Sequence, residues 1–234
     1  NLSQLAAASF GQTFNITPLQ LITAVSACVN GGELMKPYIL REVRDPEGNI
    51  VSVTEPTVVR RVISEETSAI VRSALEQVVG DSVEGTGKNA AVLGYRIGGK
   101  TGTSEKVAQD AAGGEKEYIV SFLGVAPMDD PQIAVLILLD TPSNETGIYI
   151  SGGQMAAPTV GRFFADALPY LGYEPSYTPE QLADLSRTVP DLSGLELGEA
   201  QAALRNAGLN SRVVGSGDHI TAQLPLGGSA IAAG

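Results

Sequence analysis

Two apolar runs separated by a short turn constrain the fold of this chain more than any other feature. The first run extends from Glu117 to Val125 and the second from Gln132 to Asp140. Both have strand length and are rich in β-branched and other large apolar residues. Two parallel strands need a crossover of about a dozen residues or more, which the intervening segment 126–131 cannot provide. The sequence therefore predicts an antiparallel hairpin, and a third strand is expected just upstream, over Tyr95–Thr101.

Three helices are expected beside these strands. Thr17-Pro18-Leu19-Gln20 combines a capping threonine, a proline at the first helical position and a glutamine three residues after the cap, so a helix is predicted from here to Gly31-Gly32. Ser64 can cap a second helix, ending at Gly80. Its apolar face is predicted to comprise Ile70, Ala74 and Val78, widened by Val71, Leu75 and Val79. A third helix, expected to cover one sheet face, carries Val160, Phe163, Phe164, Ala167, Leu168 and Leu171.

Between the first two helices, residues 38–43 and 50–53 flank the turn sequence Asp45-Pro46-Glu47-Gly48, which predicts a further hairpin. The pattern as a whole predicts an α+β fold in which an antiparallel sheet is flanked by helices.

A change of composition after this region predicts a second, smaller α+β domain. Residues 173–188 are polar, contain two prolines and are interpreted as a linker between a domain over 1–172 and another over 189–234. In the second domain Gly208 is expected to stop a helix, and short strands are expected around Val213-Val214 and His219-Ile220-Thr221. The apolar face of that helix comprises Leu197, Ala200, Ala203, Leu204 and Ala207.

Charge and the scarcity of cysteine and histidine exclude several classes of function. The chain has 15 basic and 26 acidic residues, a net charge of −11, which disfavours nucleic-acid binding. Cys28 and His219 are the only residues of their kinds, so the sequence contains neither a disulfide framework nor a histidine-rich metal site. We expect no metal and no cofactor.

The residues best suited to catalysis or ligand binding are Lys100-Thr101-Gly102-Thr103, at the end of the third predicted strand. A lysine, hydroxyl groups and an exposed backbone N–H on one strand edge can hold a carboxylate and a developing oxyanion together. A plainer alternative is a glycine-rich edge strand with a solvated lysine. Gly94–Thr101 also fits a phosphate-loop pattern, with Asp140 as a Mg²⁺ ligand. That third interpretation is disfavoured, because a phosphate loop opens a helix and precedes parallel strands.

The motif resembles the third motif of the transpeptidase domain that penicillin-binding proteins share with serine β-lactamases. The resemblance to class B penicillin-binding proteins extends over residues 1 to about 172. Upstream it includes Ser9-Phe10-Gly11-Gln12, Thr17-Pro18-Leu19-Gln20-Leu21, Asn30-Gly31-Gly32 and Lys36-Pro37. Downstream it includes residues 118–127 and Ala156-Ala157-Pro158.

This resemblance implies roles for the motif residues. Lys100 and Thr103 are the expected catalytic residues, with Lys100 organising hydrogen bonds and positive charge and the Thr103 N–H forming half of the oxyanion hole. Thr101, Gly102 and Thr103 are the expected substrate-binding residues, the two hydroxyls facing a substrate carboxylate. The implied parent is a D,D-transpeptidase that cross-links peptidoglycan stem peptides through a serine acyl-enzyme and is acylated by β-lactams.

The resemblance also implies an extracytoplasmic parent, anchored in the membrane by an N-terminal segment absent from this chain, with division or elongation machinery among its expected partners. Division, elongation and sporulation roles all stay open. No serine of the chain has Lys three residues later or Asn two residues later. In the family, Ser-x-x-Lys and Ser-x-Asn precede the region of Ser9-Phe10-Gly11-Gln12, so we expect this chain to be inert alone. A wall-binding protein with a decayed transpeptidase domain is the alternative.

Residues 189–234 resemble a PASTA domain, a small extracytoplasmic module. The matching segments are Val189-Pro190-Asp191-Leu192-Ser193-Gly194, Glu199–Leu204, Ala207-Gly208-Leu209 and Gln223–Gly228. The resemblance implies that the module is incomplete here, lacking its last strand. It leaves two roles open, binding of cell-wall muropeptides and simple packing.

Overall fold

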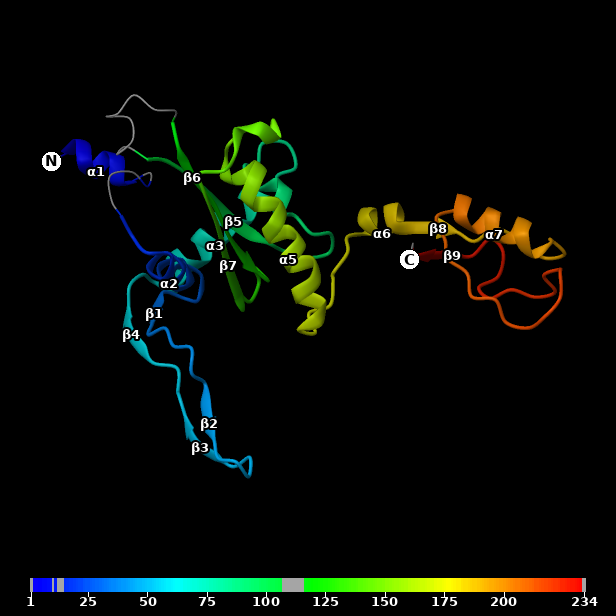
Figure 1. Ribbon diagram of the computed structural model, residues 1–234, viewed down its shortest axis with the longest axis horizontal. Helices are drawn as coiled ribbons and strands as arrows, with labels where there is room; N and C mark the ends of the chain where they lie inside the picture. Colours follow the sequence, from blue (N-terminus) through cyan, green and yellow to red (C-terminus); the bar gives the residue numbers. More distant parts are fainter. Residues whose placement is uncertain (1, 10, 12–14, 107–115, 233–234) are drawn as a thin grey trace. The chain divides into compact units, whose positions relative to one another are not determined.

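The computed structural model describes residues 2–9, 11, 15–106 and 116–232, and divides into two compact units, Asn1–Glu174 and Pro175–Gly234 (Figure 1). Each unit is described separately below. No helix among the described residues has both the length and the apolar character needed to cross a membrane.

The first unit is built around a three-stranded antiparallel sheet with strand order β5-β6-β7. The strands are β5 (Gly98–Glu105), β6 (Tyr118–Ala126) and β7 (Ile133–Asp140). The predicted β6–β7 hairpin is confirmed, with Ile119 opposite Asp140 and Ala126 opposite Ile133. The prediction for the upstream strand was displaced, since β5 begins three residues later than Tyr95 and continues past Thr101. Lys100-Thr101-Gly102-Thr103 therefore lies wholly inside a strand.

Close packing explains why glycines occupy the start of β5, where strand propensity alone disfavours them. A Cβ at Gly99 would lie 2.3 Å from the Phe122 ring, and one at Gly98 would lie 2.6 Å from the sulfur of Met128. The two glycines are thus required by what lies on the two faces of the sheet.

Helices cover both faces of this sheet (Figure 1). On one face α5 (Ala157–Tyr170) packs Val160, Phe164 and Leu168, all fully buried, around Phe122. On the other face α2 (Pro18–Val29) and α3 (Glu65–Gly80) pack around Leu123 and Val125. The α+β class with an antiparallel sheet flanked by helices is confirmed.

The helix starts agree with the sequence prediction. In α2 the Thr17 hydroxyl accepts a hydrogen bond from the Gln20 N–H at 3.2 Å, and the Gln20 side chain accepts one from the Thr17 N–H at 2.9 Å, which is a complete capping box. Ser64 caps α3 by accepting a hydrogen bond from the Thr67 N–H at 3.1 Å.

The predicted apolar face of α3 was partly wrong. Ile70 is 64% exposed and Ala74 is also exposed, whereas the predicted Val79 is buried and the predicted Val71, Leu75 and Val78 are half-buried. Ser68, which the apolar pattern did not include, is buried as well. The Ser68 hydroxyl donates to the Cys28 carbonyl at 2.8 Å and accepts from the Gly31 N–H at 3.1 Å. This polar anchor, absent from an apolar pattern, turns the helix so that Ser68 and Val79 face the protein.

A two-stranded ribbon connects α2 to α3 (Figure 1). Strand β1 (Glu33–Met35) pairs with β4 (Val58–Arg61), and β2 (Glu42–Arg44) pairs with β3 (Ile50–Val53), both antiparallel. The predicted hairpin is therefore confirmed, with a shorter first strand. The unit also contains α1 (Leu2–Ser9), short 3-10 segments η1 (Lys88–Ala90) and η2 (Asn144–Thr146), and η3 (Gly152–Ala156), a π-helical turn that leads into α5.

The second unit contains α6 (Pro179–Leu185), β8 (Ser186–Thr188), α7 (Leu197–Asn206) and β9 (Ala230–Ala232). Antiparallel pairing of β8 with β9 joins the two ends of this unit. Helix α6 and strand β8 lie in the stretch that composition presents as a linker. The buried apolar residues are Val189, Leu192, Ala200 and Leu209.

The two strands predicted inside the second unit do not form. No strand forms at Val213-Val214, and His219 makes only an isolated bridge with Glu196. Gly215 and Gly217 adopt φ values of 102° and 134°, a left-handed backbone that interrupts an extended run.

Candidate active site at the free edge of β5

Strand β5 is an edge strand, because β6 pairs with one side of it and no described strand pairs with the other. Its unpaired backbone groups are therefore open to a ligand. The phosphate-loop interpretation is wrong on this geometry, since Gly98–Thr101 of that motif lies on a strand that belongs to an antiparallel sheet.

Two hydrogen bonds at the ends of β5 show which backbone groups face the free edge. The Arg96 carbonyl accepts from the Met128 N–H, and the Lys106 N–H donates to the Glu117 carbonyl, both at 2.9 Å. The backbone N–H and C=O groups of the even-numbered residues therefore face β6. In an antiparallel strand the N–H and C=O of one residue point to the same side, and the side alternates along the strand. The N–H of Thr103 consequently points to the free edge.

Lys100 supplies positive charge at this edge. Its side chain is exposed, and its ammonium group donates a hydrogen bond to the carbonyl oxygen of Thr101 at 2.7 Å. That carbonyl faces the free edge, as the alternation requires. No ion pair of Lys100 is found within the described ranges, so the charge is not neutralised by a neighbouring carboxylate there.

The two threonines lie in different surroundings. They share the sheet face opposite to that of Lys100, because side chains alternate along a strand. Thr103 is exposed, whereas Thr101 is half-buried beside η3, with its methyl carbon 3.5 Å from the place where a Cβ of Gly153 would stand. Of the two hydroxyls, that of Thr103 is the more accessible. The Lys100 side chain thus lies on one face of β5, and the Thr101 and Thr103 side chains lie on the other.

The turn η3 packs closely against β5 and β6, a feature that sequence reasoning missed. A Cβ at Gly152 would lie 1.9 Å from the Ser121 carbonyl oxygen and 2.8 Å from that of Gly102, and one at Gly153 would lie 2.1 Å from the Thr86 carbonyl oxygen. Only glycine allows η3 to lie this close to β5 and β6. The adjacent pair Gly152-Gly153 was the available signal, and it was interpreted only as a boundary between elements.

Tyr149 was also missed. It is 80% exposed and stands three residues before Gly152, in the segment that leads from β7 to η3. An exposed aromatic side chain this close in sequence to η3 is a candidate for ligand contact.

A polar cluster at the far end of β5 centres on Lys106. Its ammonium group donates to the Thr141 hydroxyl at 2.8 Å, lies 3.4 Å from a carboxylate oxygen of Glu117, and makes a close ion pair with Asp140. The hydrogen bond with Asp140 raises the pKa of Lys106, and the same bond with Lys106 lowers the pKa of Asp140. The Thr141 hydroxyl also contacts Glu117 at 3.1 Å and Asp140 at 2.9 Å.

Within the described part of the chain, no group of three or more His, Cys, Asp and Glu side chains is arranged to hold a metal ion. The groups that β5 presents at its free edge are a lysine, hydroxyl groups and backbone N–H groups.

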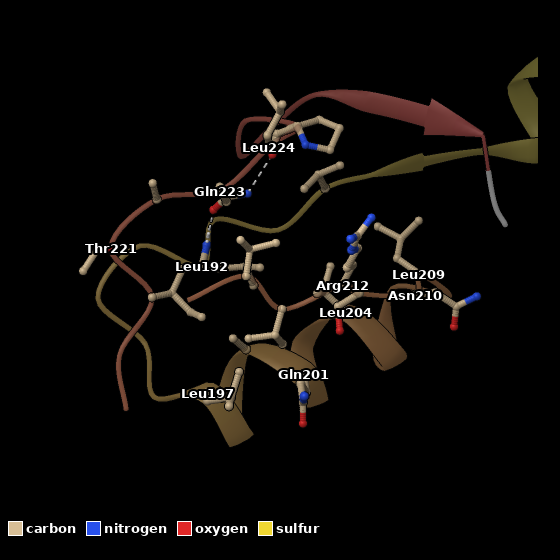
Figure 2. A pocket seen from close by; sticks show the side chains of 18 of the residues that line it. Leu192, Leu197, Gln201, Leu204, Leu209, Asn210, Arg212, Thr221, Gln223 and Leu224 are labelled. Atoms are coloured by element: carbon tan, nitrogen blue, oxygen red, sulfur yellow. Dashed lines mark hydrogen bonds between the residues drawn. The ribbon is translucent and has the colours of Figure 1, made fainter. Parts of the chain in front are cut away.

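The second unit contains a cavity of about 510 Å³, shown in Figure 2, between α7 and the segment that follows it. Leu192, Leu197, Leu204 and Leu209 are among its aliphatic lining residues, and no aromatic ring is among the described residues that line it. The Gln223 amide accepts from the Leu192 N–H at 2.6 Å and donates to the Pro190 and Pro225 carbonyls at 3.0 and 3.1 Å. The Gln223 amide is thus hydrogen-bonded to backbone groups of the same unit.

Comparison with protein families finds two matches along the chain. Residues 1–165 match the penicillin binding protein transpeptidase domain, and residues 187–234 match the PASTA domain.

Two relatives illustrate the similarity of the chain to known proteins. The chain is 43% identical to stage V sporulation protein D of Bacillus subtilis over 235 residues, covering 98% of this chain and 35% of that protein. It is 37% identical to a probable peptidoglycan D,D-transpeptidase FtsI of Caulobacter vibrioides over 178 residues, covering 72% of this chain and 28% of that protein. The chain thus spans about a third of the length of these relatives.

Solved structures give the same result for the fold. The transpeptidase domain of penicillin-binding protein 3 from Burkholderia pseudomallei aligns with a TM-score of 0.57 and 35% identity, covering 73% of this chain and 47% of that one. The D,D-transpeptidase domain of a peptidoglycan glycosyltransferase from Eggerthella lenta aligns with a TM-score of 0.53 and 28% identity, covering 70% and 36%.

Proposed function

Since the chain belongs to the penicillin-binding protein transpeptidase family and carries a PASTA domain, we propose that the free edge of β5 is the substrate-binding side of a D,D-transpeptidase active site. The whole protein would cross-link peptidoglycan stem peptides through a serine acyl-enzyme and would be acylated by β-lactams. The observation that carries this proposal is the Thr103 N–H, which points to the free edge of the strand that holds Lys100.

In this reaction a serine oxygen adds to a substrate carbonyl, and the carbonyl oxygen becomes an oxyanion. The Thr103 N–H is the proposed donor to that oxyanion, and Lys100 stabilises the same negative charge electrostatically. The C–N bond to the leaving amine then breaks as the amine takes up a proton. A second amine later takes the acyl group from the serine, which releases the cross-linked product.

Recognition of the substrate is proposed to depend on hydroxyl groups at the same edge. The exposed Thr103 hydroxyl, with Thr101 behind it, can donate to the carboxylate of a stem peptide or of a β-lactam. Gly102 lies between them in the strand, and a Cβ there would lie 2.4 Å from the Ser121 side-chain oxygen on the opposite face. Tyr149 is proposed to contact the substrate from the segment that precedes η3.

The nucleophile and its base are proposed to lie in a part of the protein outside these 234 residues, because no Ser-x-x-Lys or Ser-x-Asn occurs in the sequence. The chain alone is therefore proposed to be inactive. An extracytoplasmic location and a membrane anchor are likewise proposals, supported by the family alone, as are division, elongation or sporulation partners.

The test compares the chain with the full-length protein. After incubation with fluorescent penicillin, denaturing gels should show a covalent adduct on the full-length protein and none on the 234-residue chain. Lys100→Ala in the full-length protein should slow adduct formation by about 10²-fold, the scale on which a preorganised electrostatic group acts. A full-length protein that forms no adduct would refute the proposed activity, and an adduct on a serine of the chain alone would refute the placement of the nucleophile.

A wall-binding role for the second unit has weaker support. Sugar recognition commonly uses polar groups and stacked aromatic rings, whereas the cavity of this unit is mainly aliphatic and the Gln223 amide is already hydrogen-bonded. The cavity therefore suits an apolar group better than a glycan.

A further inference from the structure

Lys106 joins the ends of all three strands of the central sheet. It directly follows β5, and its partners are Glu117, just before β6, Asp140, the last residue of β7, and Thr141. The exposed fraction of its side chain is 28%, against 60% for Lys116, which pairs with Glu105 nearby. A single ammonium group thus connects three acceptors, and Thr141 bridges the two carboxylates.

The same cluster fixes the start of the segment that returns to β5. Thr141 adopts a φ of 49°, uncommon for a residue with a branched side chain, and its N–H donates to the Tyr118 carbonyl at 2.8 Å. The segment 141–151 begins here and ends at η3, where Gly152 lies against the Gly102 carbonyl. The segment is therefore held at both ends. The Lys106 cluster and Tyr118 hold its start beside the end of β5, and η3 holds its end against β5 and β6.

A surface ion pair of ordinary kind contributes little and positions nothing. The Lys106 cluster differs because its members come from three strand ends, because one of them has an unusual backbone angle, and because the two points of attachment lie on either side of Thr103. Movement of the β5 end would displace the Thr103 N–H and the start of the segment that carries Tyr149 together.

We propose that Lys106 is a positioning residue, which holds the end of β5 and the segment 141–151 in the arrangement that presents the Thr103 N–H to the substrate. This inference rests on the proposed function. Lys106 touches no reacting atom, so its effect is on the geometry of the oxyanion donor. Donors act over short distances, and a displacement of about 1 Å can cost as much as 10²-fold in rate.

The experiment uses the full-length protein with Lys106→Met, Lys106→Arg and, as a control for loss of a nearby charge, Lys116→Met. Acylation by fluorescent penicillin is followed at several concentrations, so that the dissociation constant and the acylation rate constant are obtained separately. Lys106→Met should lower the rate constant at least about tenfold and change the dissociation constant less than about threefold. Lys106→Arg should restore most of the rate, and Lys116→Met should match wild type.

A second variant and a thermal melt separate positioning from folding. Asp140→Asn removes one partner at a site whose side chain is 67% exposed, so it should fold normally and still lower the rate constant about threefold. An unchanged rate constant in both Lys106→Met and Asp140→Asn would overturn the inference, as would losses that follow the melting temperature across all variants. A wild-type protein that is not acylated would instead refute the proposed function.

Discussion

Thr103 contributes two different groups to the proposed site, a backbone N–H and a side-chain hydroxyl. The N–H is placed by the alternation of β5 and would survive any substitution that keeps the strand. The hydroxyl depends on the residue type. Single substitutions can therefore separate oxyanion stabilisation from carboxylate recognition.

In the full-length protein, Thr103→Val should weaken binding of carboxylate-bearing β-lactams about tenfold while leaving the acylation rate constant within about threefold. A hydrogen bond to a charged group has about this value, and valine keeps the β-branched shape. Ser104→Ala is the matched control, since its exposed side chain lies on the other face of the same strand. Concentration-dependent acylation kinetics give both constants. A large fall in the rate constant with unchanged binding would reverse the roles assigned to the two groups.

The charge cluster at Lys106 makes a prediction about pH. The pKa of Asp140 is lowered chiefly by its hydrogen bond with Lys106, so this contribution is present above the unfolded value of about 3.9 and is lost as pH falls through the folded pKa. The pKa of Lys106 is raised, so its contribution is present below about 10.4 and is lost as pH rises through the folded value. Lys106→Met should therefore raise the pKa of Asp140, measured by carboxyl-carbon NMR titration. An unchanged value would show that the ion pair does not persist in solution.

At the scale of elements, η3 packs closely against its neighbours because it contains two adjacent glycines. Gly152 and Gly153 lie against backbone carbonyls of three other segments, and Asn89 donates a side-chain hydrogen bond to the Gly153 carbonyl at 2.9 Å. A side chain at Gly152 must push η3 away from β5 and β6, and one at Gly153 must push it away from Thr86. The position of the segment that carries Tyr149 should change with it.

Gly153→Ala should destabilise the first unit by about 2 kcal/mol or more, because the new methyl group meets the Thr86 carbonyl, which is backbone and cannot move aside cheaply. Gly80→Ala is the control, since a Cβ there meets nothing within 4 Å, and it should leave stability within about 1 kcal/mol. Urea unfolding of the 234-residue chain measures both. Equal stability of the two variants would show that η3 does not pack tightly against the Thr86 carbonyl.

Much of this element arrangement could be predicted from sequence, for identifiable reasons. The capping box at Thr17 and Gln20 and the short turn between β6 and β7 are local signals, and both predictions were confirmed. Apolar spacing predicted the inward face of α3 only in part, because a buried serine that bonds to Cys28 and Gly31 also orients the helix. The extension of β5 past Thr101 depends on pairing with residues 118–122, which no local pattern records.

The candidate site also contains residues that the sequence could identify and residues that it could not. Lys100, Thr101, Gly102 and Thr103 could be named because the motif is contiguous, although their roles stay predictions. The proposed contributions of Lys106 and Gly152 depend on segments far apart in sequence, since the fold places Lys106 beside Asp140 and Gly152 beside the Gly102 carbonyl. Tyr149 is proposed only from its exposure and its place before η3. Apart from the adjacent glycines at 152 and 153, the sequence contains no local signal for such contacts.

At the scale of the whole molecule, the chain consists of two compact units, and the proposed chemistry belongs to the first. The β5 edge, η3 and the Lys106 cluster all lie in Asn1–Glu174, whereas the cavity lies in Pro175–Gly234. None of the contacts used to build the site involves the second unit.

Deletion of residues 175–234 from the full-length protein should therefore leave the acylation rate within about tenfold of wild type, which is about 1.4 kcal/mol of transition-state free energy. Fluorescent-penicillin kinetics on the shortened protein measure this, with circular dichroism as a control for folding. A far larger loss in a folded protein would mean that the second unit shapes the active site.

The most direct test of the central claim is a crystal structure of the full-length protein acylated by a penicillin. The account predicts that the acyl carbonyl oxygen lies about 2.7–3.1 Å from the backbone nitrogen of Thr103, the range expected of an oxyanion-hole donor, with the penicillin carboxylate toward the Thr103 hydroxyl. An acyl carbonyl that accepts no hydrogen bond from Thr103, or an acyl group bound away from the free edge of β5, would contradict it.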